Sequence, residues 1–378
     1  MRIIHLILGK ARLNRMNGIN KVAHNLALHQ QEMGWKSEIW GITGSPGRKP
    51  TARAYPLRLF QQQRWGFLID PALKKALEGL NPKTDRVHIH GSFIPAFYRA
   101  SRILARRAVP YIYCPHGALS PGALERSAAK KRWYFRLFES VILNKAACVQ
   151  FLGEEQYRAI DSYLDLPQKI IIPNGQNLAE LSFEPAPLPL PYGPIFSFCG
   201  RLDMDHKGLD LLFEGFDAYV QEGGKGHLWL IGDGMDYQHL VELTKRRQLN
   251  HRITFWGSRF GSEKLNLLHH SDVFLHTSRY EGLPTAVLEA AGLGKPCLVS
   301  RPTNMGKALE NAGAGWLVQP NQPDHILATM LEVEQKWEAG ALADMGRNAY
   351  ELIKEQFNWA SLSQQLIHKA YGGEWVNV

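Results

Sequence analysis

The sequence predicts an α/β protein with two domains, each built on a parallel β-sheet that helices cover on both faces. Apolar runs of about four to seven residues alternate with helical patterns of about ten or more along the whole chain, which is typical of doubly wound parallel sheets. The length of 378 residues is more than one ordinary domain needs. A proline-rich segment at residues 183–194 separates two parts of similar size.

In the first part, apolar runs predict strands and the stretches between them predict helices. The predicted strands are residues 2–8, 36–42, 86–91, 110–117 and 147–153. The predicted helices are residues 20–33, 94–106 and 123–145. Because parallel sheets bind ligands at the carboxyl ends of their strands, the residues that follow each strand are candidates for a binding site.

The second part repeats this alternation. Its predicted strands are residues 195–201, 227–234, 252–258, 272–278 and 296–302. Its predicted helices are residues 208–222, 235–247, 263–269 and 285–293. The whole chain therefore predicts two doubly wound sheets in succession.

The segment FEPAPLPLPYGP has proline at almost every second position. Proline removes backbone donors and favours an extended chain, so this segment is predicted to be a linker at 183–194. The N-terminal domain is then residues 1–182, and the C-terminal domain is residues 195–356. Residues 357–378 contain a last predicted helix, 361–371, which could cross back to the N-terminal domain.

Composition argues against several classes of protein. The four cysteines are too few and too scattered for a disulfide framework or a zinc cluster, and buried reduced thiols are expected. The apolar stretch at residues 3–8 is too short for a signal peptide. No window approaches the roughly 18 uninterrupted apolar residues of a membrane-spanning helix. The expected location is the cytoplasm.

Positive charge is concentrated in the first half of the chain. Residues 1–190 contain 27 Lys and Arg against 13 Asp and Glu, whereas residues 191–378 contain 17 against 22. This asymmetry predicts an anionic partner for the first half, and nucleic acid and an anionic membrane surface are both candidates. An ordinary solvated surface is the alternative, because Lys and Arg are mostly surface residues.

The densest motif is SRYEGLPTAVLEAAGLGKP, residues 278–296. Glu281 follows a predicted strand, and Glu289 lies eight positions later in the predicted helix. Pro284 suits the first turn of that helix, so the amides of residues 285–287 are expected to be free at an N-terminus that can bind an anion. Two carboxylates beside this site could hold sugar hydroxyls while the amides hold phosphate. In isolation they would be a loop carboxylate and a helix-surface residue.

A second motif, CGRLDMDHKGLDLL at residues 199–212, follows another predicted strand. Arg201 and Lys207 both lie in the loop before the next helix. Arginine offers a planar fork of donors and lysine a compact charge, a pair that suits a pyrophosphate. Together they would neutralise the charge that develops on a departing nucleoside diphosphate.

The first loop, residues 9–20, contains Gly18 just before a predicted helix, where a glycine lets the backbone approach a ligand closely. The chain has no G-x-G-x-x-G fingerprint, no G-x-x-x-x-G-K-[ST] phosphate loop and no G-x-S-x-G elbow. Nicotinamide chemistry, P-loop hydrolysis and serine-hydrolase chemistry are therefore weakly supported.

Histidines fall at two predicted strand ends, HIHG (88–91) and PHG (115–117). His88 and His90 share one face of a strand and could form a metal pair, but no third ligand is evident, so no metal is expected. His116 lies on a constrained loop between a proline and a glycine. It suits a hydrogen bond to a sugar, and a purely structural role fits it equally well.

Taken in order, these motifs resemble those of glycosyltransferase family 4. The matching series is Gly18, HIHG, PHG, IPNG (172–175), GRLDMDHKG (200–208), LIGDG (230–234), FWGS (255–258) and EGLPTAVLEA (281–290). The resemblance runs from residue 1 to residue 371. It implies the GT-B fold, in which two Rossmann-like domains face a central cleft, and a retaining transferase that uses a nucleotide sugar.

The resemblance also implies roles for individual residues. Arg201 and Lys207 would bind the donor's diphosphate. Glu289 would hold the ribose hydroxyls, and Glu281 would contact the donor sugar. Because the two cations neutralise the leaving group, neither a metal nor another cofactor is implied.

Backbone groups and one histidine complete the implied site. The amides of Leu283 and Thr285 would touch sugar or phosphate, and Gly18 would let the first loop meet the diphosphate. His116 would lie beside the transferred sugar. Retention in this family is pictured as front-face attack, with the leaving phosphate assisting deprotonation of the acceptor. No protein nucleophile is then needed.

The sequence departs from the family pattern at three places. Asn17 and Gly18 stand where a Gly-Gly pair is frequent, and Pro284 stands where many members have glycine. Arg301 and Asn304 lie where many members carry a Gly-Gly turn. The last departure bears on the pocket for the donor sugar.

The resemblance implies that the N-terminal domain binds the acceptor, so the positive charge of the first half would lie in the acceptor-binding domain. Residues 119–147 interleave cations with large apolar side chains: Lys130, Lys131, Arg132 and Arg136 with Trp133, Tyr134, Phe135 and Leu137. The loop 47–67 adds Arg48, Lys49, Arg53, Arg58 and Arg64. Such a helix can lie on an anionic membrane, each cation adding about 1 kcal/mol. An ordinary buried helix with a charged edge is the alternative.

The leading functional hypothesis is a retaining hexosyltransferase of polysaccharide, lipopolysaccharide or glycolipid assembly, peripheral to the inner face of the membrane. A UDP-sugar is the expected donor, with a GDP-sugar as the alternative, and nucleic acid is not expected as a partner. The other hypotheses are a nucleotide-sugar epimerase or phosphorylase of similar fold, and a non-catalytic anion-binding scaffold.

Overall fold

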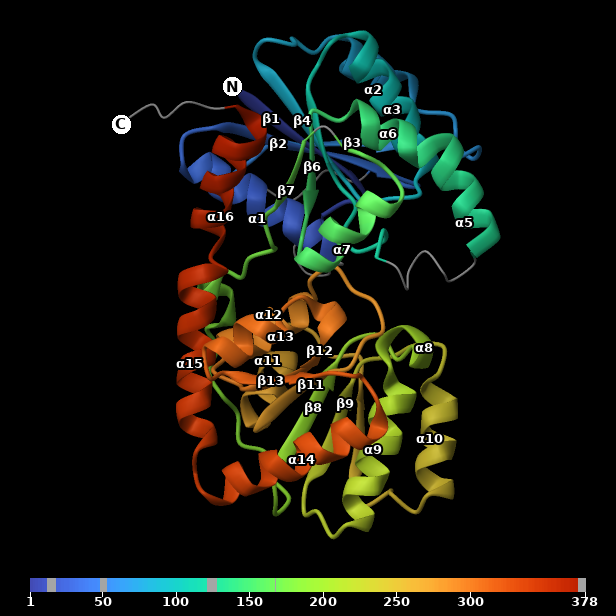
Figure 1. Ribbon diagram of the computed structural model, residues 1–378. Coiled ribbons are helices and arrows are strands. Elements are labelled where there is room, and N and C mark those ends of the chain that lie inside the picture. Colours follow the sequence, from blue (N-terminus) through green and yellow to red (C-terminus); the bar gives the residue numbers. More distant parts are fainter. Residues whose placement is uncertain (12–17, 48–52, 121–127, 167, 373–378) are drawn as a thin grey trace. The chain divides into compact units, whose positions relative to one another are not determined.

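The computed structural model describes residues 1–11, 18–47, 53–120, 128–166 and 168–372 (Figure 1). It divides into two compact units, Met1–Asn174 with the chain from Trp359 onward, and Gly175–Asn358. Each unit is built on its own parallel sheet, so the predicted α/β class with two Rossmann-like domains is confirmed.

The first unit has a seven-stranded sheet in the order β3-β2-β1-β4-β5-β6-β7. Its strands are β1 (Arg2–Leu8), β2 (Lys36–Thr43), β3 (Leu57–Gln61), β4 (Asp85–His90), β5 (Tyr111–Cys114), β6 (Cys148–Phe151) and β7 (Lys169–Ile171). Its α-helices are α1 (Gly18–Glu32), α2 (Pro71–Glu78), α3 (Pro95–Arg106), α5 (Ala128–Tyr134), α6 (Ser140–Lys145), α7 (Glu154–Ala159) and α16 (Trp359–Leu366). A π-helical segment, Phe135–Glu139, joins α5 to α6, and another, Ile367–Tyr371, follows α16. The predicted helix 123–145 corresponds to this α5–α6 stretch, with residues 123–127 outside the described part.

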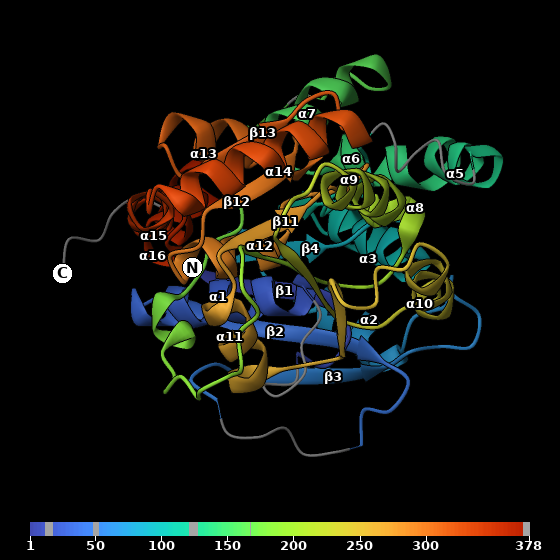
Figure 2. The same cartoon turned by 90° about the horizontal axis from the view of Figure 1, so that it is seen from below.

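Helices cover both faces of this sheet (Figures 1 and 2). Side chains of a strand alternate between the two faces, and β1 shows this directly. Ile4 packs in the core that includes Phe97 of α3, whereas Ile3 packs on the opposite face with Val22 of α1 and Trp359 of α16. His5 of β1 and His88 and His90 of β4 lie on the face of the sheet that α1 and α16 cover.

The second unit has a six-stranded sheet in the order β10-β9-β8-β11-β12-β13. Its strands are β8 (Ile195–Cys199), β9 (His227–Ile231), β10 (Ile253–Gly257), β11 (Val273–His276), β12 (Cys297–Ser300) and β13 (Gly315–Val318). Its α-helices are α8 (Met204–Lys207), α9 (Leu209–Gln221), α10 (Tyr237–Arg246), α11 (Gly261–His270), α12 (Thr285–Gly292), α13 (Gly306–Asn311), α14 (Pro323–Glu338) and α15 (Leu342–Gln356). Phe196 and Phe198 of β8 pack with Phe216 of α9 and Ile326 of α14 in the main core.

The boundary between the units falls eight residues earlier than the sequence predicts. Gln176 donates its backbone amide to Phe357 O at 2.8 Å, and Leu181 packs against Gly292, so residues 175–182 belong to the second unit. The proline-rich segment 183–194 is also part of that unit and does not lie between the two. Its extended backbone runs along the unit's surface, where the amide of Ala186 donates to Asn266 Oδ1.

The end of the chain returns to the first unit. Trp359, Leu362 and Leu366 of α16 are buried beside Val22 and Leu26 of α1. The final helical segment therefore completes one face of the first sheet. All four cysteines are free thiols, three of them buried and the fourth, Cys199, partly exposed.

Candidate active site

The strand order of the second sheet reverses between β8 and β11. From β8 the chain moves outward through β9 to β10, and from β11 it moves through β12 to β13 in the other direction. Parallel sheets bind ligands outside the carboxyl ends of strands at such a reversal. Arg201 and Lys207 follow β8, and Glu281 and Glu289 follow β11. The four side chains predicted to bind the donor thus follow the two strands that flank the reversal.

Glu281 is the centre of a largely buried polar cluster. Its carboxylate forms an ion pair with Lys207 Nζ and accepts hydrogen bonds from His276 Nε2 at 3.3 Å and Ser278 Oγ at 3.2 Å. The side chains of Lys207 and Glu281 are only 12% and 13% exposed. The fold thus brings together two predicted site residues that lie far apart in the sequence.

The surroundings of Glu281 keep its carboxyl ionised. Burial alone would raise the pKa of this carboxyl, but the charge of Lys207 and the hydrogen bond from His276 outweigh burial and hold the pKa well below its usual range. Burial lowers the pKa of His276. It also lowers the pKa of His206, whose Nε2 is 3.7 Å from the Glu281 carboxylate, to about 4. Glu281 is therefore an acceptor of hydrogen bonds at neutral pH, surrounded by neutral imidazoles.

Gly208 allows the loop after β8 to reach the end of β11. It has the left-handed conformation with φ +61°, and a Cβ atom at this position would lie 2.2 Å from Thr277 O. Thr277 Oγ1 donates to the carbonyl oxygens of Lys207 and Gly208, each at 3.2 Å. This close backbone approach places the Lys207 side chain beside Glu281.

A second set of contacts fixes the same two loops. Arg279 forms a bidentate pair with Asp210 at 2.6 and 2.7 Å, and its backbone amide donates to His206 O at 3.1 Å. The His206 ring stacks on Tyr280 with 4.4 Å between ring centroids. The site is therefore held in place by contacts within the second unit.

Glu289 forms a separate, buried ion pair. It lies on α12 and accepts from Lys264 Nζ of α11 at 2.6 Å, with side-chain exposures of 7% and 20%. Lys264 was not predicted to be a site residue, because it stands on another helix with no motif around it. A ligand hydroxyl that binds Glu289 would do so in competition with this ammonium group, or beside it.

Arg201 differs from the other cations of the site. Its side chain is exposed, and the described residues provide no hydrogen bond or ion pair to its guanidinium. Its charge nevertheless contributes to the lowered pKa of His206, which places it near the Glu281 cluster. Arg201 is therefore available to an incoming anion.

The predicted anion site at the start of α12 is only partly present. The helix begins at Thr285 as predicted. However, the amide of Val287 donates to Pro284 O at 3.1 Å, so the prediction that it is free is wrong. This hydrogen bond closes a turn from Pro284 to Val287 at the start of the helix, so the Val287 amide already has an acceptor. Leu283 is buried, whereas Thr285 is partly exposed.

The unusual segment after β12 is tied to the Glu281 loop. Asn304, with φ +60°, donates from Nδ2 to Gly282 O at 2.7 Å. Arg301 is exposed. Of the two departures from the family pattern, Asn304 therefore supports the loop that carries Glu281.

In the first unit, His116 follows β5 and has φ +49°, which is uncommon for a residue other than glycine. Burial lowers the pKa of His116 to about 4. Gly18 begins α1, is exposed, and a Cβ atom on it would meet nothing within 4 Å. Packing within the described chain therefore does not require glycine there. Residues 12–17 of the first loop, including Asn17, lie outside the described residues.

A third histidine joins the pair that the sequence suggested as metal ligands. His5 of β1 pairs in register with His88 of β4, and ring nitrogens of His5, His88 and His90 lie within 4.8 Å of one another. The prediction that His88 and His90 have no third potential metal ligand is therefore wrong, because His5 lies beside them. The His88 and His90 rings stack with centroids 4.0 Å apart, and His5 hydrogen-bonds to His90. The in-plane lone pairs of two stacked rings run parallel and do not converge on one ion. This arrangement suits hydrogen bonds to separate partners better than a shared metal ion.

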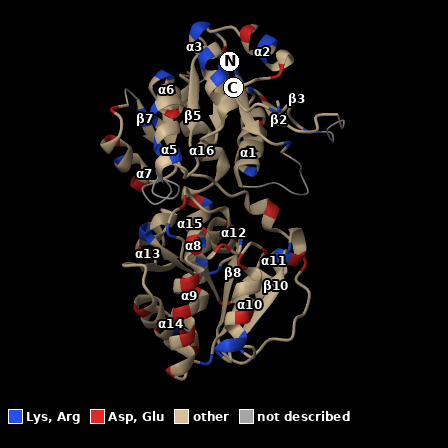
Figure 3. Ribbon diagram, turned by 90° about the vertical axis from the view of Figure 1, so that its right-hand side faces the viewer, with Lys and Arg blue, Asp and Glu red and all other residues tan. Residues whose placement is uncertain are grey.

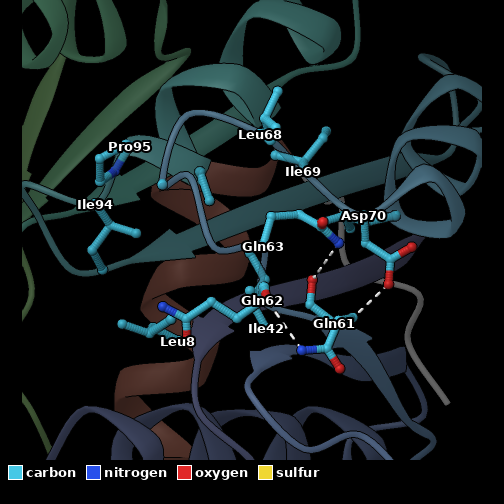
Figure 4. Close-up of a pocket in the computed structure, with 13 residues that line it drawn as sticks. Leu8, Ile42, Gln61, Gln62, Gln63, Leu68, Ile69, Asp70, Ile94 and Pro95 are labelled. Carbon is cyan, nitrogen blue, oxygen red and sulfur yellow. Dashed lines mark hydrogen bonds between the residues drawn. The ribbon is translucent and has the colours of Figure 1, made fainter.

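A small pocket lies at the carboxyl ends of β1, β2 and β3 (Figure 4). Its floor is apolar and includes Leu8, Ile42 and Ile94, and the amide side chains of Gln61 and Gln63 lie at its rim. Its volume of about 40 Å³ accommodates water or one small substituent, since a water molecule needs roughly 10–15 Å³ on this scale. Part of the predicted basic loop 47–67 is strand β3, where the guanidinium of Arg58 lies over the ring of Trp40, 4.9 Å from its centroid.

Sequence reasoning missed the histidines around Glu281. His276 is the last residue of β11, and its position at a strand end was the available signal. His206 lies between Arg201 and Lys207 in the second motif. Neither was predicted to be a site residue. Within the described residues, no helix is both long and apolar enough to span a lipid bilayer.

Two family models match the chain in succession. Residues 17–175 match the glycosyl transferase 4-like domain, and residues 185–352 match glycosyl transferases group 1. The chain is 28% identical over 298 residues to the UDP-Gal:alpha-D-GlcNAc-diphosphoundecaprenol alpha-1,3-galactosyltransferase of Escherichia coli. That match covers 73% of this chain and 72% of the enzyme.

Solved structures share the fold over nearly the whole chain. The sucrose-phosphate synthase of Thermosynechococcus elongatus has a TM-score of 0.77 at 18% identity, covering 97% of this chain and 98% of its own. Anabaena Alr3699/HepE in complex with UDP has a TM-score of 0.74 at 17% identity, covering 99% and 100%. With both family models matched in order on this architecture, the chain belongs to the GT-B glycosyltransferases that join a glycosyl transferase 4-like domain to a group 1 domain.

Proposed function

We propose that this glycosyltransferase moves a hexose, with retention of configuration, from a nucleotide sugar to a saccharide or lipid-linked acceptor. The observation that carries the proposal is the Lys207–Glu281 ion pair beside the uncommitted Arg201, at the strand reversal of the second sheet. A UDP-sugar is the favoured donor, because the galactosyltransferase relative is named for UDP-Gal and the HepE complex contains UDP.

The two cations would act on the leaving group. Arg201 would bind the diphosphate through its planar fork, and Lys207 would place a second positive charge beside it. These charges stabilise the nucleoside diphosphate as the bond to the sugar breaks. No metal or other cofactor is needed to supply that charge.

Glu281 and Glu289 would hold hydroxyl groups. Glu281 stays ionised and can accept hydrogen bonds from hydroxyls of the donor sugar, while Glu289 would accept from the ribose. The amides of Leu283 and Thr285 and the backbone at Gly18 would lie along the diphosphate. With no protein nucleophile in this set, front-face attack by the acceptor, assisted by the leaving phosphate, accounts for retention.

Titration calorimetry with UDP and GDP, without added metal, tests the donor site. We expect the wild-type protein to bind one nucleotide, and Arg201→Ala to weaken that binding tenfold or more, or about 1.4 kcal/mol. Arg247→Ala is the matched control, because Arg247 is an exposed arginine of the same unit that pairs with Asp217 at 3.1 Å. Absence of binding to both nucleotides, or equal effects of the two substitutions, would contradict the proposal.

We further propose that the first unit docks on an anionic membrane, where a lipid-linked acceptor would be found. Trp133 and Leu137 are 68% and 44% exposed, and Arg132 and Arg136 are exposed in the same helical stretch. Figure 3 marks in blue the positions of Lys and Arg along the ribbon of α5 and α6. An outward face that combines cations with large apolar groups suits the interface of an anionic bilayer.

Vesicle co-sedimentation tests the membrane proposal. We expect binding to vesicles that contain phosphatidylglycerol at low salt, weaker binding at high salt because of screening, and at least severalfold weaker binding after Trp133→Ser. Tyr192→Ser is the control, since Tyr192 is an aromatic residue of the second unit that is 74% exposed. Failure of the wild-type protein to sediment at low salt would refute membrane docking and leave the donor site untouched.

A further inference from the structure

A continuous chain of hydrogen bonds crosses the buried face of the first sheet. His116 Nε2 lies 3.0 Å from His90 Nδ1, and His90 Nε2 lies 2.9 Å from His5 Nδ1. The chain ends at Gln30 of α1, whose Oε1 lies 2.9 Å from His5 Nε2. The three inner residues are at most 1% exposed. Strand alternation puts His5 of β1 and His90 of β4 on one face of the sheet, so the sheet itself aligns these two rings.

The inner end of this chain sets the direction of every hydrogen bond in it. Gln30 Oε1 also accepts from Ser37 Oγ at 2.9 Å, and an amide oxygen cannot donate. The Gln30 amide turns its oxygen toward both Ser37 and His5, and its own Nε2 makes no hydrogen bond within the described residues. With the amide in this orientation, His5 carries its proton on Nε2, which leaves its Nδ1 to accept from His90 Nε2. His90 Nδ1 then accepts from His116 Nε2. Burial lowers the pKa of His5 to about 4 and that of His90 well below its usual value, so the inner rings are neutral at pH 7.

At the outer end, His116 is partly exposed and lies just after the carboxyl end of β5. Its left-handed backbone, φ +49°, costs about 1–2 kcal/mol in a residue other than glycine. Such strain persists where the surrounding structure fixes a residue for a function. Within the described chain, His116 Nδ1 has no hydrogen-bond partner, so this nitrogen is available to a ligand.

We propose that Gln30, His5 and His90 are positioning residues that hold His116 as the tautomer with its proton on Nε2 and a free lone pair on Nδ1. A neutral imidazole of this form accepts a hydrogen bond at Nδ1 and cannot donate one there. The ligand group it fits is a hydroxyl, as on the transferred sugar, and not a phosphate oxygen. The inference rests on the proposed function for the hydroxyl-bearing substrate, and it adds the direction of the hydrogen bond and the residues that impose it.

Long-range ¹H–¹⁵N NMR of the wild-type protein tests the tautomer directly, with the His116 signals assigned by their loss in His116→Gln. We expect a protonated Nε2 and an unprotonated Nδ1 at pH 7. A protonated Nδ1 would overturn the inference, because it corresponds to the opposite direction of the whole chain. This measurement does not depend on transfer activity, and binding of UDP to the same sample reports the donor site separately.

Two substitutions of His90 separate positioning from simple structural support. In His90→Asn, the side-chain oxygen can replace Nδ1 and still accept from His116. In His90→Gln, the amide reaches the place of Nε2 and keeps only the link to His5. We expect His90→Gln to change the His116 tautomer and to lower kcat about tenfold or more, the usual scale for loss of an orienting partner, with little change in the KM of the donor. His90→Asn should retain the tautomer and most of kcat.

His88→Gln is the matched control for these variants. His88 is on the same strand and equally buried, but its Nδ1 bonds to Tyr371 and not to the chain. It should leave the His116 tautomer unchanged. Equal effects of His90→Asn and His90→Gln on kcat, with both proteins folded by circular dichroism, would show that His90 has only a structural role. If neither variant folds, the NMR measurement of the His116 tautomer in the wild-type protein decides whether the inference holds.

Discussion

Lys207→Met is expected to slow sugar transfer by about 10²–10³-fold, the scale for removing one group that stabilises charge in a transition state. The ammonium of Lys207 lies in a largely buried site, where its interaction with a departing diphosphate is weakly screened. Methionine keeps the length and apolar volume of the side chain, so the loss reflects charge. Initial rates of transfer, or of donor hydrolysis where the acceptor is not in hand, measure the effect.

The same substitution leaves the Glu281 carboxylate without its main partner, so lower stability could be mistaken for lower activity. Removing one member of a buried pair typically costs about 3–5 kcal/mol. The double variant Lys207→Met/Glu281→Gln removes both charges and should recover much of that stability while remaining inactive. Lys225→Met breaks a surface pair with Glu338 and should change neither property. Transfer at the wild-type rate by folded Lys207→Met would remove Lys207 from the mechanism.

Gly208→Ala is expected to destabilise the protein by at least about 2 kcal/mol and to abolish most activity. The new Cβ would lie 2.2 Å from Thr277 O, a backbone atom that cannot move aside without displacing the end of β11. Left-handed φ adds about 1–2 kcal/mol for any residue with a Cβ. The urea midpoint of unfolding measures the change in stability.

Gly223→Ala is the matched control for Gly208→Ala. Gly223 also has positive φ, +89°, but a Cβ atom there would meet nothing within 4 Å. Gly223→Ala should lose only the stability that left-handed φ costs a residue with a Cβ, and it should keep full activity. If the two alanine variants have the same urea midpoint, the close approach of Gly208 to β11 does not contribute to stability.

The sequence predicted the central strands of both sheets but missed three edge strands, β3 and β7 of the first sheet and β13 of the second. β1 and β8 are mostly apolar because helices bury both faces of a central parallel strand. β3 and β7 are short and half-exposed, so they carry no such run. The domain boundary was misplaced for a related reason. The prolines of residues 183–194 do indicate extended chain, but an extended chain can lie along a domain as well as between domains.

The candidate site could be predicted only as far as local motifs reach. Arg201 and Glu281 stand in loops after strands, and Glu289 lies within α12, as their positions along the chain indicate. Lys207 was predicted to lie in a loop but ends the short helix α8. Lys264 could not be found, because its pairing with Glu289 depends on how two helices pack. Only part of the histidine chain could be predicted. Alternation predicts that His88 and His90 share a face of their strand, but the contact of His90 with His5 of the neighbouring strand depends on how the strands pair in the folded sheet.

The return of the chain to its first unit has a consequence for synthesis. Residues 175–358 are contiguous, so the second unit can fold as soon as its own segment has left the ribosome. The first unit cannot, because Trp359 and Leu366, which cover the apolar face of its sheet, are made after the whole of the second unit. The earlier part of the chain must therefore wait for residues 359–371, and this apolar face of its sheet stays uncovered until they have been made.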